Sequence, residues 1–223
     1  MKQKKFDGIF ENGNRLYTKN LVRGSVYGER LFKEGKHEYR EWDPKRSKLS
    51  AAIMKGASQI GLREHHVVLY LGASTGTTPS HISDIVGNRG FVFALDFAPR
   101  MVRKLVFLCE QRKNMAPLLA NASEPDTYQD RITMVDYVYQ DIAQRDQLRI
   151  FLLNCSRFLE KGGFAALCVK ARSVDVARRP KDIFLETRKE LEKHLTIIDY
   201  RELDPFEKDH CIFICKKTRD LHL

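Results

Sequence analysis

A loop of small and hydroxyl-bearing residues, Gly72-Ala73-Ser74-Thr75-Gly76-Thr77-Thr78, follows an apolar run and precedes a stretch that Pro79 opens as a helix. Small residues let the backbone turn sharply and approach a ligand, and a helix amino terminus offers free N–H groups. The spacing does not match G-x-G-x-x-G, so a dinucleotide pyrophosphate is a poor fit. The hydroxyls of Thr77 and Thr78 can instead bind the amino and carboxylate groups of a methionine moiety. A tight strand-to-helix turn without a ligand is the alternative.

An acidic residue, Asp96, ends the next apolar run, 24 residues after the first glycine of the loop. A carboxylate at that position can accept both ribose hydroxyls of a nucleoside. Phe97 can lie against an adenine ring, and Asn121-Ala122 follows the third apolar run, where an adenine amine would be read. An N-cap before Pro99 is the alternative role of Asp96, but it leaves the spacing unexplained. The glycine-containing loop, Asp96 and the turn at Asn121-Ala122 together predict a nucleoside cofactor.

The composition indicates a polyanionic partner. The 223 residues include 39 Lys+Arg against 29 Asp+Glu, a net charge of +10, and such a surplus favours contact with phosphates. A basic protein without a nucleic-acid role is the alternative. No apolar stretch reaches the roughly 18 residues of a membrane span, and no apolar segment of a signal peptide follows the basic start, so we expect a cytoplasmic protein without membrane contact. The five cysteines form no C-x-x-C pair, and we expect no metal site.

Two regions with different sequence patterns must position these residues. Residues 1–46 hold short β-like runs at 6–10, 15–17, 21–22, 26–27 and 38–42, with an Asn-Gly hairpin signal and further glycines between them, which predicts a small antiparallel β appendage. Residues 47–223 form the second predicted domain. It begins with a helix over residues 48–60, for which Ser47 is the candidate N-cap.

From there strands and helices alternate, which is typical of a parallel sheet covered by helices. The expected strands are 67–71, 91–96, 118–119 with its neighbours, 134–139 and 164–170, and the expected helices are 79–86, 99–113, 145–160 and 180–194. Two final β runs, 195–203 and 211–216, have no room for a crossover helix between them and must pair antiparallel. Seven strands with a reversed last strand form the α/β plan of class I (Rossmann-like) methyltransferases.

Several longer blocks resemble the fibrillarin family, the methyltransferases of box C/D ribonucleoproteins. These blocks are YLGASTGTTPSHISD, ALDFAPR, QDIAQ, VKARSVDV and DPFEKDH, and the likeness runs over nearly the whole chain. No glycine-arginine-rich segment precedes the domain, so the chain resembles the archaeal form. The resemblance implies S-adenosylmethionine as cofactor and transfer of its methyl group to ribose 2′-hydroxyls of rRNA and possibly tRNA.

The resemblance also implies site residues. The family's cofactor contacts fall on the loop after Gly72 and on Thr77, Thr78, Asp96, Phe97, Asn121, Ala122, Asp141 and Gln144. Fibrillarins more often have Glu where this chain has Asp96, and Asp where it has Asn121, and we expect altered affinity rather than a different cofactor.

The catalytic set that the resemblance implies is Lys48, Asp141, Lys170 and His210, like the Lys-Asp-Lys-His set of 2′-O-methyltransferases. Ends of successive parallel strands meet at one edge, and the reversed last strand begins there, so these residues should converge. Lys170 is expected to hold or accept the hydroxyl proton, with its pKa lowered by Lys48 and partial burial, while Asp141 orients its ammonium. The alternatives are a surface Lys170 paired with Asp141 and a His210 that caps a hairpin.

The family implies four partners: a Nop-domain scaffold protein, a box C/D guide RNA, a kink-turn-binding ribosomal-type protein and the substrate RNA. The guide would choose the target nucleotide, which the sequence therefore does not reveal. Two other function classes stay open. A small-molecule or protein methyltransferase would work without RNA behind a lid segment, and a non-catalytic RNA-binding module would keep only the fold; the presence of both Asp141 and Lys170 argues against the latter.

Overall fold

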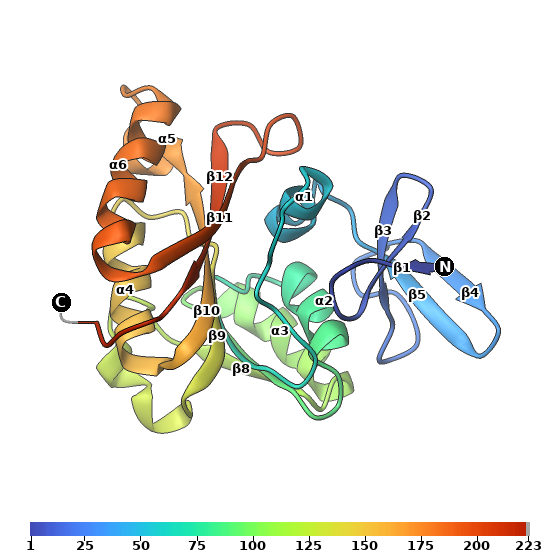
Figure 1. Cartoon of the computed structure of the whole chain (residues 1–223). Helices are drawn as coiled ribbons and strands as arrows, with labels where there is room; N and C mark the ends of the chain where they lie inside the picture. The colour runs from blue at the N-terminus through green and yellow to red at the C-terminus, as the bar shows by residue number, and fades with distance from the viewer. Residues whose placement is uncertain (222–223) are drawn as a thin grey trace.

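The computed structural model describes residues 1–221, and two sheets organise them (Figure 1). The smaller sheet is antiparallel, with the strand order β1-β2-β3-β5-β4. Its strands are β1 (Lys2–Gln3), β2 (Ile9–Asn12), β3 (Arg15–Lys19), β4 (Leu31–Glu34) and β5 (His37–Glu41). The expected β runs at 21–22 and 26–27 are wrong, because this segment is a loop, and β4 was not expected.

The larger sheet has seven strands in the order β11-β12-β10-β9-β6-β7-β8, which confirms the predicted plan. Its strands are β6 (Val67–Leu71), β7 (Phe91–Asp96), β8 (Met115–Leu119), β9 (Val135–Gln140), β10 (Leu159–Lys170), β11 (Thr196–Glu202) and β12 (His210–Lys216). Six strands run in the same direction, and only β12, which lies between β10 and β11, is antiparallel to its neighbours. In the terminal hairpin, β11 therefore forms the edge of the sheet, and the reversed strand β12 lies between β11 and β10.

Helices cover both faces of the larger sheet. They are α1 (Lys48–Met54), α2 (Thr77–Val86), α3 (Pro99–Gln111), α4 (Gln147–Phe158), α5 (Ala171–Val174) and α6 (Pro180–His194). Figure 1 shows α4 and α6 on one side of the sheet and α2 and α3 on the other. Each face packs its own apolar cluster. No helix within residues 1–221 is long and apolar enough to cross a membrane.

The first helix is shorter than expected, and its end has a local cause. We expected a helix over residues 48–60, but α1 stops at Met54. Gly56 adopts the left-handed conformation, with φ +78°, that commonly terminates helices. Ile60 still joins the core from the following loop. Apolar spacing alone therefore overestimated the helix.

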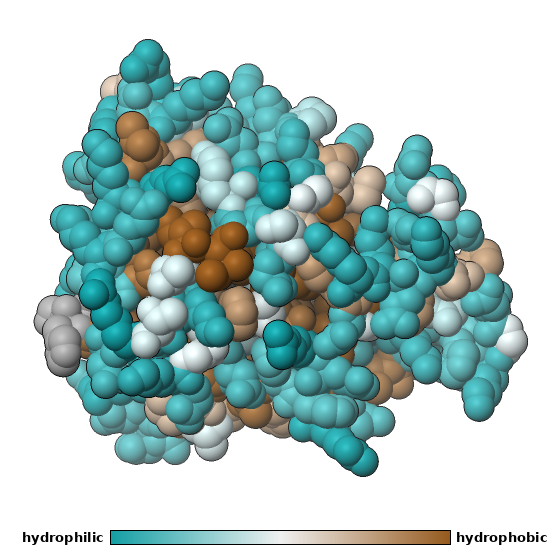
Figure 2. Space-filling view, in the orientation of Figure 1, coloured by the Kyte–Doolittle hydropathy of each residue, from teal (hydrophilic) through white to brown (hydrophobic). Residues whose placement is uncertain are grey.

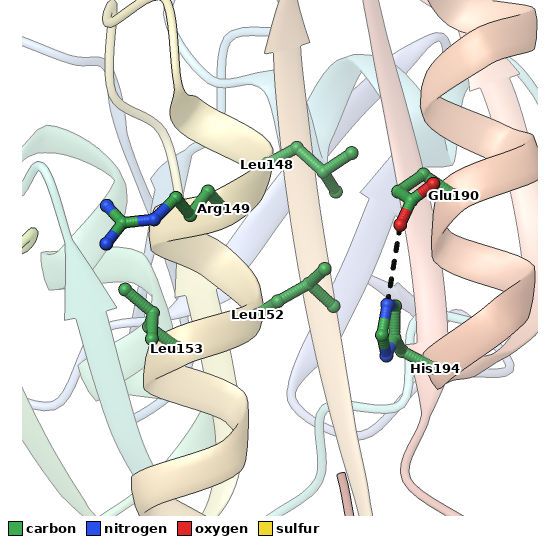
Figure 3. A pocket seen from close by; sticks show the side chains of 6 residues that line it. All are labelled: Leu148, Arg149, Leu152, Leu153, Glu190 and His194. Atoms are coloured by element: carbon green, nitrogen blue, oxygen red, sulfur yellow. Dashed lines mark ion pairs between the residues drawn. The ribbon is translucent and has the colours of Figure 1, made fainter. Parts of the chain in front are cut away.

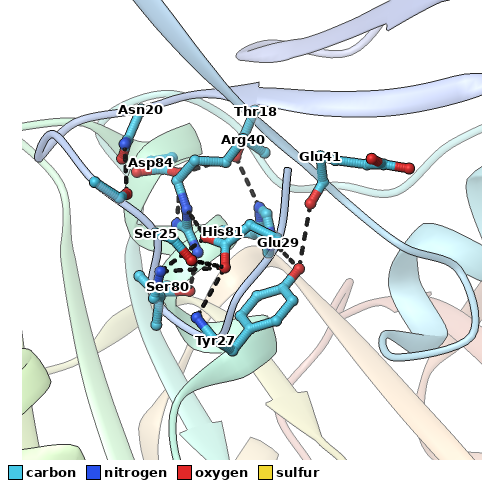
Figure 4. A network of polar contacts seen from close by, with 12 residues as sticks. Thr18, Asn20, Ser25, Tyr27, Glu29, Arg40, Glu41, Ser80, His81 and Asp84 are labelled. Atoms are coloured by element: carbon cyan, nitrogen blue, oxygen red, sulfur yellow. Dashed lines mark hydrogen bonds and ion pairs between the residues drawn. The ribbon is translucent and has the colours of Figure 1, made fainter. Parts of the chain in front are cut away.

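The two sheets share one core and a buried polar network (Figure 4). Ile9, Leu16 and Trp42 from the amino-terminal region pack in the same apolar cluster as α1 and α2. Beside them, Arg40 of β5 donates to Asp84 of α2 over 2.9 Å, and both side chains have 0% exposure. The small sheet is thus fixed to α2, the helix that begins at the predicted cofactor loop.

An apolar groove of about 670 Å³ lies between α4 and α6 (Figure 3). Leu148 and Leu152 point from α4 towards α6, and Glu190 pairs with His194 on the opposite wall. None of the predicted site residues lines this groove. On the face drawn in Figure 2, hydrophilic residues predominate; the largest apolar patch lies over β11 and β12, and smaller apolar groups are scattered elsewhere.

Candidate active site at the carboxyl edge of the sheet

The predicted cofactor loop joins β6 to α2 and lies tightly against the end of β9. Gly72 has φ +85°, and a Cβ there would lie 2.3 Å from the carbonyl oxygen of Asp141. The backbone N–H of Asp141 donates to the carbonyl of Leu71 over 2.9 Å. A side chain at position 72 would therefore separate the loop from Asp141, which explains the glycine. The cofactor loop and the predicted catalytic residue Asp141 therefore contact each other through their backbones.

The two loop threonines face different surroundings. Thr78 is buried, with 6% exposure, and its hydroxyl donates to Ser47 Oγ over 3.1 Å. Ser47 occupies the N-cap position of α1 as expected, but its side chain caps no helix N–H and binds Thr78 instead. Thr77 is half-buried. Because α2 has Gly76 as its N-cap residue, no side chain occupies its first N–H groups, and a ligand carboxylate fits there.

Asp96 lies beside this loop at the end of β7. Its Oδ2 accepts the N–H of Ser74 over 2.7 Å, and its Oδ1 accepts the N–H of Ala98 over 2.9 Å. Each carboxylate oxygen has a second lone pair, so both ribose hydroxyls can still bind. Next to it, the Phe97 ring is 67% exposed, although large apolar side chains usually avoid water. An exposed ring beside a fixed carboxylate fits the nucleoside part of S-adenosylmethionine.

The turn after β8, which holds Asn121 and Ala122, and the loop after β9, which holds Gln144, contain the remaining predicted cofactor residues. Asn121 accepts the N–H of Ser123 and donates to Glu124, so its amide is occupied within its own turn. Ala122 is buried, with 5% exposure. Gln144 is half-buried after the end of β9. The roles of these residues towards a cofactor stay predictions.

Lys48 and Asp141 form the central ion pair of the predicted catalytic set. Lys48 opens α1, and its Nζ lies 2.9 Å from Asp141 Oδ2, with the two side chains 15% and 28% exposed. Burial disfavours the ammonium, but the charge and hydrogen bond of Asp141, together with Cys168 and Glu207, outweigh it and raise the pKa of Lys48 above its ordinary value. Asp141 therefore orients Lys48, whereas the sequence led us to expect that it orients Lys170. That expectation is corrected.

Lys170 and His210 lie opposite each other on the antiparallel strands β10 and β12. Directly opposed residues point to the same face, with Cβ atoms about 5 Å apart. The side chain of Lys170 is exposed, contrary to the partial burial that we expected, and it forms no ion pair among residues 1–221. His210 Nδ1 lies 2.6 Å from the carbonyl of Lys208. With a proton on Nδ1, this bond leaves Nε2 as the acceptor atom.

One residue that contacts this set carried no signal in the sequence. Gln147, at the first position of α4, hydrogen-bonds the backbone of Lys170 with its side chain. A glutamine that opens a helix has no distinctive pattern, so only the packing of α4 against β10 reveals it. The edge therefore brings together the loop, Asp96, Lys48, Asp141, Lys170 and His210.

Comparison with known proteins places this arrangement in context. The family described as Fibrillarin matches residues 1–219. A "Fibrillarin-like rRNA/tRNA 2′-O-methyltransferase" from Methanothermobacter thermautotrophicus is 49% identical over 216 residues, which cover 96% of each chain.

Two solved structures are also similar over most of this chain. Fibrillarin of Aeropyrum pernix in complex with natively bound S-adenosyl-L-methionine has a TM-score of 0.87 at 40% identity, covering 96% of each chain. A fibrillarin/Nop5p complex has a TM-score of 0.89 at 38% identity, covering 96% of this chain and 100% of the matched one.

Proposed function

This chain belongs to the fibrillarin family, and from that premise we propose that it is the catalytic subunit of a box C/D ribonucleoprotein, in which a guide RNA directs it to its targets. Its chemistry is S-adenosylmethionine-dependent 2′-O-methylation of rRNA and tRNA. One observation carries the proposal. The Lys48–Asp141 pair stands at the edge where the cofactor loop touches Asp141 and where Lys170 faces His210.

The residues of the edge have separate tasks in methyl transfer. S-adenosylmethionine supplies a methyl group on a sulfonium, whose carbon–sulfur bond breaks as the oxygen–carbon bond forms. A 2′-hydroxyl is a poor nucleophile, so it must be aligned and relieved of its proton. Lys170 holds the hydroxyl and is the proposed acceptor of its proton, while the neighbouring His210 offers Nε2 as a second acceptor. The Lys48–Asp141 ion pair holds these two side chains in place beside the cofactor loop.

Guidance by RNA and assembly with partners rest on charge and on the relatives. The net charge of +10 suits phosphate contacts, which position a protein without reading bases. A relative crystallised with Nop5p supports a Nop-domain scaffold as one partner. The guide RNA and the kink-turn-binding protein complete the proposed particle, and base pairing with the guide selects the nucleotide.

Methyl transfer from labelled S-adenosylmethionine tests this proposal. Target RNA is incubated with the purified chain alone and with the chain assembled on guide RNA, Nop-domain protein and kink-turn-binding protein. We expect one methylated ribose, at the nucleotide that the guide specifies, and only in the assembled sample. Efficient site-specific methylation of naked RNA would refute dependence on a particle. Label on a protein or small molecule without RNA would favour the other enzyme class.

A further inference from the structure

The backbone of Lys170 lies beyond the end of the strand that should support it. On one side, β12 pairs with β10 as far as the Lys170–His210 pair. On the other side, the parallel pairing with β9 ends three residues earlier, at Leu167 and Gln140. Unpaired backbone groups of an edge need other partners to stay fixed. The proposed proton-accepting lysine is therefore held by a strand on one side only.

The side chain of Gln147 takes the place of the missing strand. Its Oε1 accepts the N–H of Lys170 over 3.2 Å, and its Nε2 donates to the carbonyl of Lys170 over 3.3 Å. One side-chain amide thus binds both polar groups of a single residue, as a neighbouring peptide unit would in a sheet. Gln147 is 1% exposed, so water does not compete for these bonds.

The same amide reaches the predicted cofactor side of the edge. Nε2 of Gln147 also donates to the carbonyl of Gln144 over 3.1 Å. The backbone carbonyl of Gln147 accepts Nε2 of Gln140 over 2.5 Å, and Gln140, with 0% exposure, directly precedes Asp141. Gln147 is therefore bonded to the backbone or side chain of three neighbours that belong to, or adjoin, the proposed site.

We propose that Gln147 is a positioning residue for methyl transfer, which holds the backbone of Lys170 in a fixed place relative to Gln144 and to the strand end before Asp141. This inference rests on the proposed function. The Lys170 side chain is long, exposed and free of ion pairs in the described chain, so its backbone is the part that the fold can fix. Displacement of a reacting group by about 1 Å can cost about 100-fold in rate. Loss of Gln147 should therefore slow the chemical step while cofactor binding persists.

Two substitutions remove the bonds in steps. Gln147→Leu deletes all three side-chain bonds, and Gln147→Glu keeps an acceptor for the Lys170 N–H while an ionised carboxylate cannot donate. The matched control is Asn114→Leu. Asn114 is another buried amide, which donates to the carbonyls of Ser83 and Gly87 over 2.9 Å each, outside the site residues. Both leucine variants lose two hydrogen bonds to backbone carbonyls, but only position 147 lies beside Lys170.

Each variant is assembled into the particle, and single-turnover methyl transfer, the KM for target RNA and calorimetric affinity for S-adenosylmethionine are measured. We expect Gln147→Leu to lose about 10- to 100-fold in kcat, with the KM and cofactor affinity within about threefold of wild type. Gln147→Glu should lose less, and Asn114→Leu should keep its kcat.

A folded Gln147→Leu variant with a kcat within threefold of wild type overturns the proposal, and so does an equal loss in Asn114→Leu. If Gln147→Leu does not fold, Gln147→Glu decides by the same criterion. The wild-type particle separates this inference from the proposed function. An inactive wild-type particle would contradict the proposed function itself, whereas an active one with active variants contradicts only the role of Gln147.

Discussion

Removal of the Asp84 carboxylate should strongly destabilise the protein, because that carboxylate joins the small sheet to α2 and α3. Its oxygens accept Arg112 over 2.6 Å, Thr18 over 2.8 Å, Arg40 over 2.9 Å and the N–H of Leu21 over 3.0 Å. The side chains of Arg40 and Arg112 are 0% and 1% exposed. In Asp84→Asn, the buried Arg40 would keep its ion pair with Glu29, whereas the buried Arg112 would lose its only ion pair within residues 1–221.

The expected magnitude follows from these contacts. The single amide oxygen of asparagine accepts about two donors, so about two of the four bonds are lost. A hydrogen bond to a charged group contributes about 1.5–3 kcal/mol, which gives about 3–6 kcal/mol. Breaking one partner of a buried ion pair independently costs about 3–5 kcal/mol. Since domains are stable by about 5–15 kcal/mol, Asp84→Asn should lose a large part of the free energy of unfolding.

The protein contains a reporter at this network. Trp42 is the single tryptophan, has 0% exposure and stacks on His81 with ring centroids 5.1 Å apart. Urea unfolding is followed by Trp42 fluorescence and far-ultraviolet circular dichroism. The control is Asp182→Asn, which breaks an exposed pair with Arg179 and should leave the midpoint unchanged. A loss below about 1 kcal/mol in Asp84→Asn would refute the reasoning, because the buried guanidinium groups would then need no carboxylate.

Three further predictions concern the site and its support. Lys170→Met should bind S-adenosylmethionine normally in calorimetry and lose about 10²- to 10⁴-fold in single-turnover methyl transfer; near-normal transfer would remove Lys170 from the mechanism. Asp96→Ala should weaken cofactor affinity about 10- to 100-fold, and unchanged affinity would contradict the ribose contact. Burial, with Arg40 and Arg112 nearby, lowers the pKa of His81 well below its ordinary value, so the unfolded chain binds more protons below about pH 6.5. Stability should fall there by up to about 1.4 kcal/mol per pH unit, and a urea midpoint that does not fall between pH 7 and 5 would contradict this.

The elements that the sequence predicted well have sharp chemical boundaries. The strands at 67–71 and 91–96 and the helix at 180–194 were predicted with the observed bounds. The first two are apolar runs closed by a glycine or an aspartate, and Pro180 pre-sets the first turn of α6. By contrast, β4 has only Leu31 and Phe32 as apolar residues, and α5 is a single turn. Such short elements depend on their neighbours in space, which a local pattern does not contain.

The site divides in the same way. Asp141, Lys170 and His210 could be placed at one edge because the alternation of elements fixes where strands begin and end. The partner of each side chain could not be predicted. Asp141 pairs with Lys48, 93 residues earlier in the chain, because α1 packs so that its first residue reaches Asp141 at the end of β9. These pairings depend on how helices pack against strands. The order of strands and helices along the sequence does not determine that packing.

Helix α2 is the part of the structure through which both regions act on the site. Its first turn follows the cofactor loop and places Thr78 against Ser47, the residue before Lys48. Its later turns carry His81 and Asp84, whose buried bonds lead to Arg40 and Thr18 in the small sheet. A helix moves as a rigid unit, so a shift of the small sheet would move the cofactor loop and the residue that precedes Lys48. The amino-terminal sheet therefore contributes to the geometry of the site although none of its residues lies at the carboxyl edge.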